Sequence, residues 1–144
     1  MSEETILIAD SDQAFTEPFA AYLLENGLRP LVIPNMARAL ETLMRESFDV
    51  AVIDFCDPSC REYVAAAVQR RVNGTAVIFT CARYSGNTER TARGLSPAFF
   101  FVKPVEPGDL LAVILRIVEL RNKQKILAEQ RMEKREGVRH EQSV

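Results

Sequence analysis

Short apolar runs alternate with longer amphipathic segments along most of the chain, and this alternation limits the possible folds more than any other feature. The expected strands are 5–9, 31–33, 50–53, 76–81 and 98–102. The expected helices are 13–26, 36–47, 59–71, 85–93 and a long one that starts near Pro107. Alternating strands and helices predict a parallel sheet with helices on both faces, and strands that are apolar throughout are typical of it. We therefore expect an α/β fold with a doubly wound, five-stranded parallel sheet in the order 2-1-3-4-5, the flavodoxin-like topology.

The composition changes near residue 120, which divides the chain into an expected domain at 1–120 and an extension at 121–144. The extension is rich in charged residues, and the last expected helix continues into it. Apolar residues form part of a heptad pattern, at Val113, Ile117, Leu120 and Leu127. Polar residues at Gln124, Arg131 and Lys134 interrupt this pattern. One interpretation is a solvated helix that frays after Gly137, and the other is a dimerising coiled coil or signalling connector.

The bulk composition is that of an ordinary globular chain and excludes several classes of protein. Of the 144 residues, 47% are apolar and 26% are charged, so a largely disordered chain is not expected. The formal net charge of −2 offers no attraction to nucleic acid or to an anionic membrane surface. The longest apolar runs, 97–102 and 110–115, are too short to cross a bilayer, and residues 1–5 do not resemble a signal peptide. We expect a cytoplasmic protein that binds neither nucleic acid nor membrane directly.

The three cysteines give little support for a metal site. They are Cys56, Cys60 and Cys81, and the only histidine is His140, near the end of the charged extension. Zinc sites usually combine four Cys or His ligands at regular spacing, which this chain lacks. The cysteines are therefore expected to be reduced thiols, as is usual in the cytoplasm.

Charged side chains stand at the ends of three expected strands. Asp10 follows the first strand, Asp54 the third and Lys103 the fifth. In a doubly wound sheet, ligands bind beyond the carboxyl ends of the strands, where the first and third strands are neighbours. Crowded carboxylates repel one another and favour a bound cation, for which Mg²⁺ with its preference for oxygen ligands is suited. A carboxylate nucleophile, a divalent metal and a lysine are what phosphoryl transfer to an aspartate requires.

In these motifs the chain resembles the receiver domain of bacterial response regulators, from about residue 5 to about residue 120. The matching segments are Ile6–Asp10, Phe48–Asp54 with Pro58 beyond it, and Phe101–Pro104. The resemblance implies that Asp54 accepts a phosphoryl group from a sensor histidine kinase or phosphotransfer protein. It also implies Mg²⁺ held by Asp10 and Asp54, Lys103 as the phosphate partner, and a cis bond before the proline. Such a domain is a switch and not an enzyme, although it aids its own phosphorylation and dephosphorylation.

Two positions depart from the family pattern. Ser11 stands where the family has a second acidic residue, usually the direct metal ligand, and Asp12 comes one position late and is expected to cap the first helix. Cys81 stands at the switch position, where the family has a Thr or Ser hydroxyl that bonds the phosphoryl oxygen. A thiol is a weaker donor, so the switch is expected to be blunted. Phe100 occupies the position of the aromatic switch residue.

These departures leave open a degenerate receiver that binds partners without being phosphorylated. A homodimer is also compatible with the sequence. A third hypothesis, a flavin or nucleotide binder, rests on 85–89, which resembles a flavodoxin phosphate loop. That loop follows the first strand in flavodoxins, but the similar segment here follows the fourth. This difference in position counts against the third hypothesis.

Overall fold

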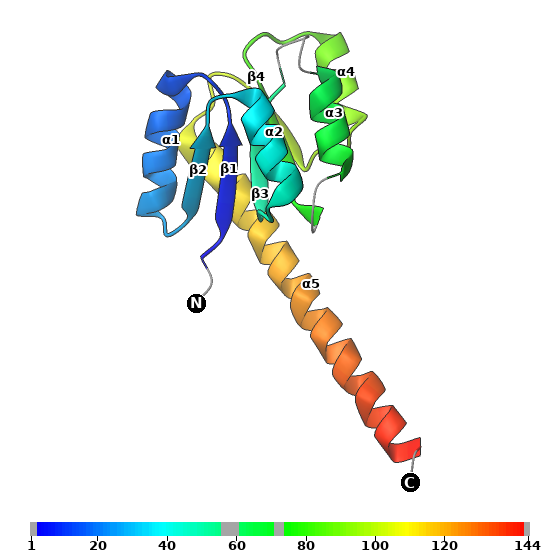
Figure 1. Cartoon of the computed structure of the whole chain (residues 1–144). Helices are drawn as coiled ribbons and strands as arrows, with labels where there is room; N and C mark the ends of the chain where they lie inside the picture. Colours follow the sequence, from blue (N-terminus) through cyan, green and yellow to red (C-terminus); the bar gives the residue numbers. More distant parts are fainter. Residues whose placement is uncertain (1–2, 56–60, 71–73, 143–144) are drawn as a thin grey trace.

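A computed structural model describes residues 3–55, 61–70 and 74–142 and contains five strands and five helices within them (Figure 1). The strands are β1 (Thr5–Ala9), β2 (Arg29–Ile33), β3 (Val50–Asp54), β4 (Ala76–Cys81) and β5 (Phe99–Val102). The helices are α1 (Gln13–Glu25), α2 (Met36–Arg45), α3 (Arg61–Arg70), α4 (Gly86–Arg93) and α5 (Pro107–Gln142). All strand pairs are parallel, and the sheet order is β2-β1-β3-β4-β5. The predicted fold class and strand order are confirmed.

Two apolar layers cover the sheet, one on each face. The first packs α2 and α3 on the sheet through buried residues such as Leu43, Val68 and Phe79. The second packs α1 and α5 on the opposite face through residues such as Phe19, Ile78 and Ile114. The three central strands are buried on both sides, because each face lies under helices. This double burial is the physical reason why their sequences are almost entirely apolar.

The edge strand β2 is two residues longer than the sequence predicts. It begins at Arg29, which pairs with Thr5 of β1, and its burial is partial along its length. An edge strand needs no continuous apolar run, so its first residues gave no apolar signal. The predicted ends of the third helix at residues 59 and 71 lie outside the described residues.

Short polar residues cap the first turns of two helices. Asn35 accepts a hydrogen bond from the backbone N–H of Arg38 at 3.0 Å, which caps α2. Ser85 accepts one from the backbone N–H of Thr88 at 3.1 Å and caps α4. Both side chains satisfy backbone donors that the first turn of a helix leaves unpaired.

Helix α5 extends far beyond the sheet (Figure 1). Its first turns are buried against the core through Leu110, Leu111, Ile114 and Val118. The guanidinium of Arg121 then donates a hydrogen bond to the backbone carbonyl of Asp49, and the side chains of residues 122–137 are exposed. The expectation that the helix frays after Gly137 is wrong, since α5 runs to Gln142. A single glycine within a helix costs only about 1 kcal/mol, which the continuing backbone hydrogen bonds tolerate. Within residues 3–55, 61–70 and 74–142, no helix is both long and apolar enough to cross a membrane.

Candidate functional site

The strand register brings the predicted site residues to one edge of the sheet. Ala9 of β1 pairs with Ile53 of β3, so Asp10 and Asp54 occupy adjacent positions where their strands end. Cys81 of β4 pairs with Val102 of β5, so Lys103 follows directly after this pair. Four side chains named from the sequence therefore come from four neighbouring strands at their carboxyl ends.

A buried ion pair joins two of these residues. The Nζ of Lys103 lies 2.7 Å from Oδ2 of Asp10, and these side chains are 11% and 2% exposed. The other carboxylate oxygen of Asp10, Oδ1, accepts the backbone N–H of Asp12 at 2.9 Å. Both oxygens of this buried carboxylate are thus hydrogen-bonded, as a charge removed from water requires. The bond between Lys103 and Pro104 is cis, as expected.

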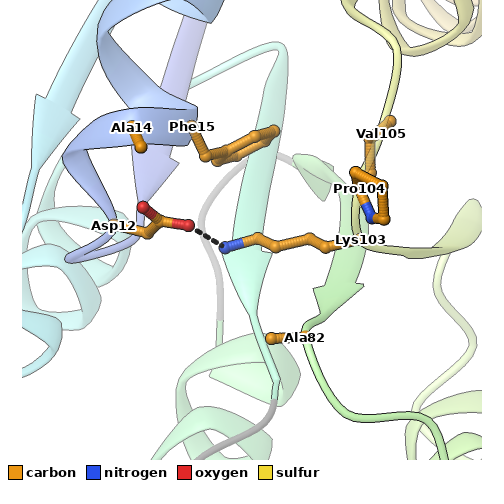
Figure 2. Close-up of a pocket in the computed structure, with 7 residues that line it drawn as sticks. All are labelled: Asp12, Ala14, Phe15, Ala82, Lys103, Pro104 and Val105. Atoms are coloured by element: carbon orange, nitrogen blue, oxygen red, sulfur yellow. Dashed lines mark hydrogen bonds and ion pairs between the residues drawn. The ribbon is translucent and has the colours of Figure 1, made fainter.

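A hollow of about 420 Å³ opens beside the Lys103 side chain. Its lining residues are Asp12, Ala14, Phe15, Ala82, Lys103, Pro104 and Val105 (Figure 2). Oδ2 of Asp12 lies 3.5 Å from the Lys103 ammonium, which is the contact drawn in Figure 2. The walls are mainly apolar, so the ammonium and the carboxylate are the charged groups that face this space.

Asp54 is the half-buried last residue of β3. It pairs across the sheet with Thr80, whose carbonyl accepts the backbone N–H of Phe55 at 2.8 Å. The ring of Phe55 in turn packs against Phe79 with centroids 4.5 Å apart. The backbone that carries the Asp54 carboxylate is therefore held against β4. In the described part of the chain, Lys103 forms its ion pairs with Asp10 and Asp12 and none with Asp54.

Cys81 is fully buried at the end of β4, and its carbonyl accepts the backbone N–H of Lys103 at 2.8 Å. The structure gives Cys81 as disulfide-bonded, so the prediction of reduced thiols does not hold for this residue. The other cysteines of the chain, Cys56 and Cys60, lie outside the described residues. Sγ of Cys81 lies 2.9 Å from the carbonyl oxygen of Arg83. Since a disulfide sulfur carries no hydrogen, this approach is a close contact and the sulfur cannot act as the weak donor expected at the switch position.

The carboxylate oxygens of Asp10 and Asp54 are the kind of ligand that Mg²⁺ prefers, but they form a sparse set. Ser11 brings no charge, and Asp10 is already paired with Lys103. Within the described residues, no group of three or more His, Cys, Asp or Glu side chains is arranged to hold a metal ion. The donor chemistry therefore fits Mg²⁺, with fewer carboxylates than a strong site would have.

Two residues that face Lys103 were not identified as site residues from the sequence. Asp12 occupies the N-cap position of α1 as predicted, but its side chain makes no capping hydrogen bond and turns toward Lys103 instead. Phe15 packs partly against the core, and the Lys103 ammonium also lies 4.7 Å from its ring centroid. Their position in the sequence could have identified them. Both residues follow Asp10 closely, at the start of the helix after β1, and this places them at the ligand-binding edge of the sheet.

A second polar network lies on α4, next to the predicted switch aromatic. The hydroxyl of Tyr84 donates to Oε2 of Glu89 at 2.8 Å, and Arg93 donates to Oε1 of Glu89 at 2.9 and 3.1 Å. The guanidinium carbon of Arg93 lies 6.0 Å from the ring centroid of Phe100. Phe100 itself is only 8% exposed, so the aromatic ring at the switch position is already turned into the protein. The network thus connects the β4–α4 segment with the switch aromatic.

The charges in this network displace two pKa values in opposite directions. The hydrogen bond to Glu89, and then the charge of that carboxylate, raise the pKa of Tyr84. The same hydrogen bond, and then those from Arg93, lower the pKa of Glu89. We expect Glu89→Gln to lower the pKa of Tyr84 toward its ordinary value, because the phenolate would no longer face a negative charge. A ¹³C NMR titration of the tyrosine rings measures this, and Glu129→Gln on the exposed part of α5 should leave Tyr84 unchanged.

Comparison with solved structures relates this geometry to known proteins. A CheY-like response regulator receiver domain from Methanospirillum hungatei JF-1 superposes with a TM-score of 0.77 at 23% identity, over 85% of this chain and 99% of that one. The chemotaxis protein CheY4 of Vibrio cholerae gives 0.69 at 20% identity, over 81% and 99% of the chains. The receiver domain of a Pseudomonas aeruginosa PAO1 sensor histidine kinase, with magnesium coordinated in its active-site cleft, gives 0.70 at 16% identity, over 82% and 99%.

No protein-family model and no curated protein sequence matches the chain. The structural likeness nevertheless extends over nearly all of each receiver domain. The chain has the CheY-like fold of response-regulator receiver domains, with the predicted acceptor, lysine and acidic residue at the expected strand ends.

Proposed function

We propose that this chain is a phosphoacceptor receiver domain that takes a phosphoryl group on Asp54 from a sensor histidine kinase or phosphotransfer protein. The observation that supports it most directly is the placement of Asp54 between two charged strand ends, with the Asp10–Lys103 pair beside it. The phosphorylated form then changes conformation and regulates a partner protein. A test is mass spectrometry after incubation with acetyl phosphate and Mg²⁺, which should add one phosphoryl group to the chain.

The transfer requires a nucleophile, a leaving group and positive charge around the moving phosphoryl group. A carboxylate oxygen of Asp54 forms the new bond to phosphorus, while the bond to the donor nitrogen or acyl oxygen breaks and its electron pair leaves with the donor. Lys103 supplies a cation that can pair with the phosphoryl oxygens once it moves from Asp10. Bound Mg²⁺, held by Asp10 and Asp54, would neutralise further negative charge on these oxygens. The chain promotes only its own phosphorylation and dephosphorylation.

The sparse set of carboxylates predicts weak metal binding that a single substitution should strengthen. Ser11 is exposed and follows directly after Asp10. Ser11→Asp adds a carboxylate at the position where the receiver family has its second acidic residue, and we expect the Mg²⁺ dissociation constant to fall by about tenfold because ligand charge drives affinity for hard cations. Isothermal titration with Mg²⁺ measures it. Ser11→Asn, which places an uncharged amide oxygen where aspartate would have a carboxylate oxygen, is the matched control. Equal affinity in all three proteins would exclude position 11 from the metal site.

A second function, that of a degenerate receiver that binds partners without phosphorylation, is favoured by three observations on the same site. Lys103 is engaged by Asp10 and Asp12, Cys81 is disulfide-bonded, and Phe100 is already buried. Each of these would reduce the conformational response to a phosphoryl group, because a ligand shifts an equilibrium only by its different affinity for the two states. A chain that gains no mass from acetyl phosphate and does not bind beryllofluoride would support this function over the first.

A further inference from the structure

The ammonium group of Lys103 is surrounded on three sides by residues at or near the N-terminal end of α1. Its Nζ lies 2.7 Å from Oδ2 of Asp10, 3.5 Å from Oδ2 of Asp12 and 4.7 Å from the ring centroid of Phe15. Figure 2 shows the Asp12 contact, with the Phe15 ring beside the end of the lysine side chain. The lysine side chain is only 11% exposed, so little water competes with these three contacts.

The ring of Phe15 is held firmly enough to act as a fixed contact. It lies in the first turn of α1 and stacks on Phe19, with centroids 5.6 Å apart and an angle of 9° between the planes. Phe19 is 1% exposed and belongs to the core between α1, α5 and the sheet. The face of an aromatic ring carries partial negative charge and attracts a cation within about 6 Å of its centre. Phe15 therefore offers Lys103 an anchored electrostatic contact that adds to the two carboxylates.

We propose that Phe15 is a positioning residue that holds Lys103 in a resting place beside Asp10 and so opposes its movement to a phosphoryl group on Asp54. This inference rests on the proposed acceptor function. Among the described residues Lys103 makes no ion pair with Asp54, so the ammonium has to leave its resting contacts to pair with phosphoryl oxygens there. A contact that exists only in the resting state lowers affinity for any ligand that requires the other state. The Phe15 ring thus sets part of the threshold for activation.

The test replaces the charge distribution of the ring while keeping its shape. Phe15→pentafluorophenylalanine removes the negative face, and beryllofluoride with Mg²⁺ serves as the phosphoryl mimic. We expect about two- to fivefold tighter beryllofluoride binding than in the unaltered protein, the range that a weak cation–π contact gives. Phe99→pentafluorophenylalanine is the control. Phe99 is an exposed aromatic on β5 whose ring, within the described residues, contacts Phe101 and no cation, and its substitution should not change the affinity.

A second measurement reports on the lysine without any ligand. The Phe15 ring should shift the ε-methylene protons of Lys103 upfield in the NMR spectrum, and Phe15→Leu should remove that shift. Unchanged or weaker beryllofluoride binding by the fluorinated protein would overturn the proposal. If no form binds beryllofluoride, the acceptor function fails, and the NMR shift then decides on the resting position alone. Loss of the upfield shift in Phe15→Leu would support the resting position of Lys103 beside the Phe15 ring. An unchanged shift would overturn it.

Discussion

Asp54→Asn is expected to abolish uptake of a phosphoryl group from acetyl phosphate in the presence of Mg²⁺, while the unaltered chain gains one. The amide of asparagine lacks the anionic oxygen that attacks phosphorus, and it also removes one of the two carboxylates available to the metal. The last residue of β3 keeps its backbone contacts in the variant, because the hydrogen bond between Phe55 and Thr80 does not involve the Asp54 side chain. Intact-protein mass spectrometry measures the loss directly.

A matched control for this experiment is Asp109→Asn. Asp109 is an exposed carboxylate in the first turn of α5 and, among the described residues, forms no ion pair with Lys103. Its variant should take up the phosphoryl group like the unaltered chain. If Asp54→Asn gains as much mass as Asp109→Asn, the acceptor is another residue.

Lys103→Met is expected to lower the free energy of unfolding by about 3–5 kcal/mol, the usual cost of leaving one partner of a buried ion pair without its counter-charge. The carboxylate of Asp10 is 2% exposed and, among the described residues, would keep only the backbone N–H of Asp12 as a partner. Methionine fills a volume close to that of the lysine stem, so a cavity contributes little to the loss. Urea unfolding followed by circular dichroism measures the change.

The double variant Asp10→Asn/Lys103→Met separates the charge effect from lost packing. An asparagine oxygen can still accept the Asp12 N–H, and it leaves no buried charge, so most of the lost stability should return. Arg45→Met is the surface control. Arg45 pairs with Glu41 with side chains that are 75% and 55% exposed, and its removal should cost at most about 1 kcal/mol. A single Lys103→Met variant as stable as the surface control would contradict the role given to the buried pair.

The sheet could be predicted from the sequence because its central strands are buried on both faces. Residues such as Val52, Ile53 and Phe79 make their strands almost continuously apolar, and this pattern is typical of parallel sheets. The edge strand β2 was predicted too short, since its outer residues are partly exposed and carry no such signal. Asn35 could be predicted as the cap of α2, because a short polar side chain stands there directly before an apolar periodicity. Ser85 caps α4 in the structure, but the polar sequence of that helix gives no such signal.

The site could be predicted as far as strand ends determine it. Asp10, Asp54 and Lys103 were expected at one edge of the sheet, and the strand register brings them there, because the carboxyl ends of parallel strands share one edge. The direct ion pair between Asp10 and Lys103 was not predicted. The direction of the Asp12 side chain could not be predicted, since an N-cap residue can bond its own helix or turn to a nearby cation. The contact of Phe15 with Lys103 could not be predicted either, because helical spacing identifies the buried face of a helix and not the residues that lie beside its end. The disulfide of Cys81 was missed because pairing depends on the distance between two sulfurs, which spacing in a sequence does not give.

The uninterrupted course of α5 has a mechanical consequence for any partner bound at its far end. The 22 residues from 121 to 142 form one helix with the segment that is packed on the sheet, and at 1.5 Å per residue they reach about 33 Å beyond it. A stiff rod magnifies motion at its base, so a tilt of about 10° at Val118 would move the tip by about 6 Å over this length. A small rearrangement at the edge of the sheet could therefore produce a much larger displacement at the far end of α5. Such a displacement would change the position of any partner bound there.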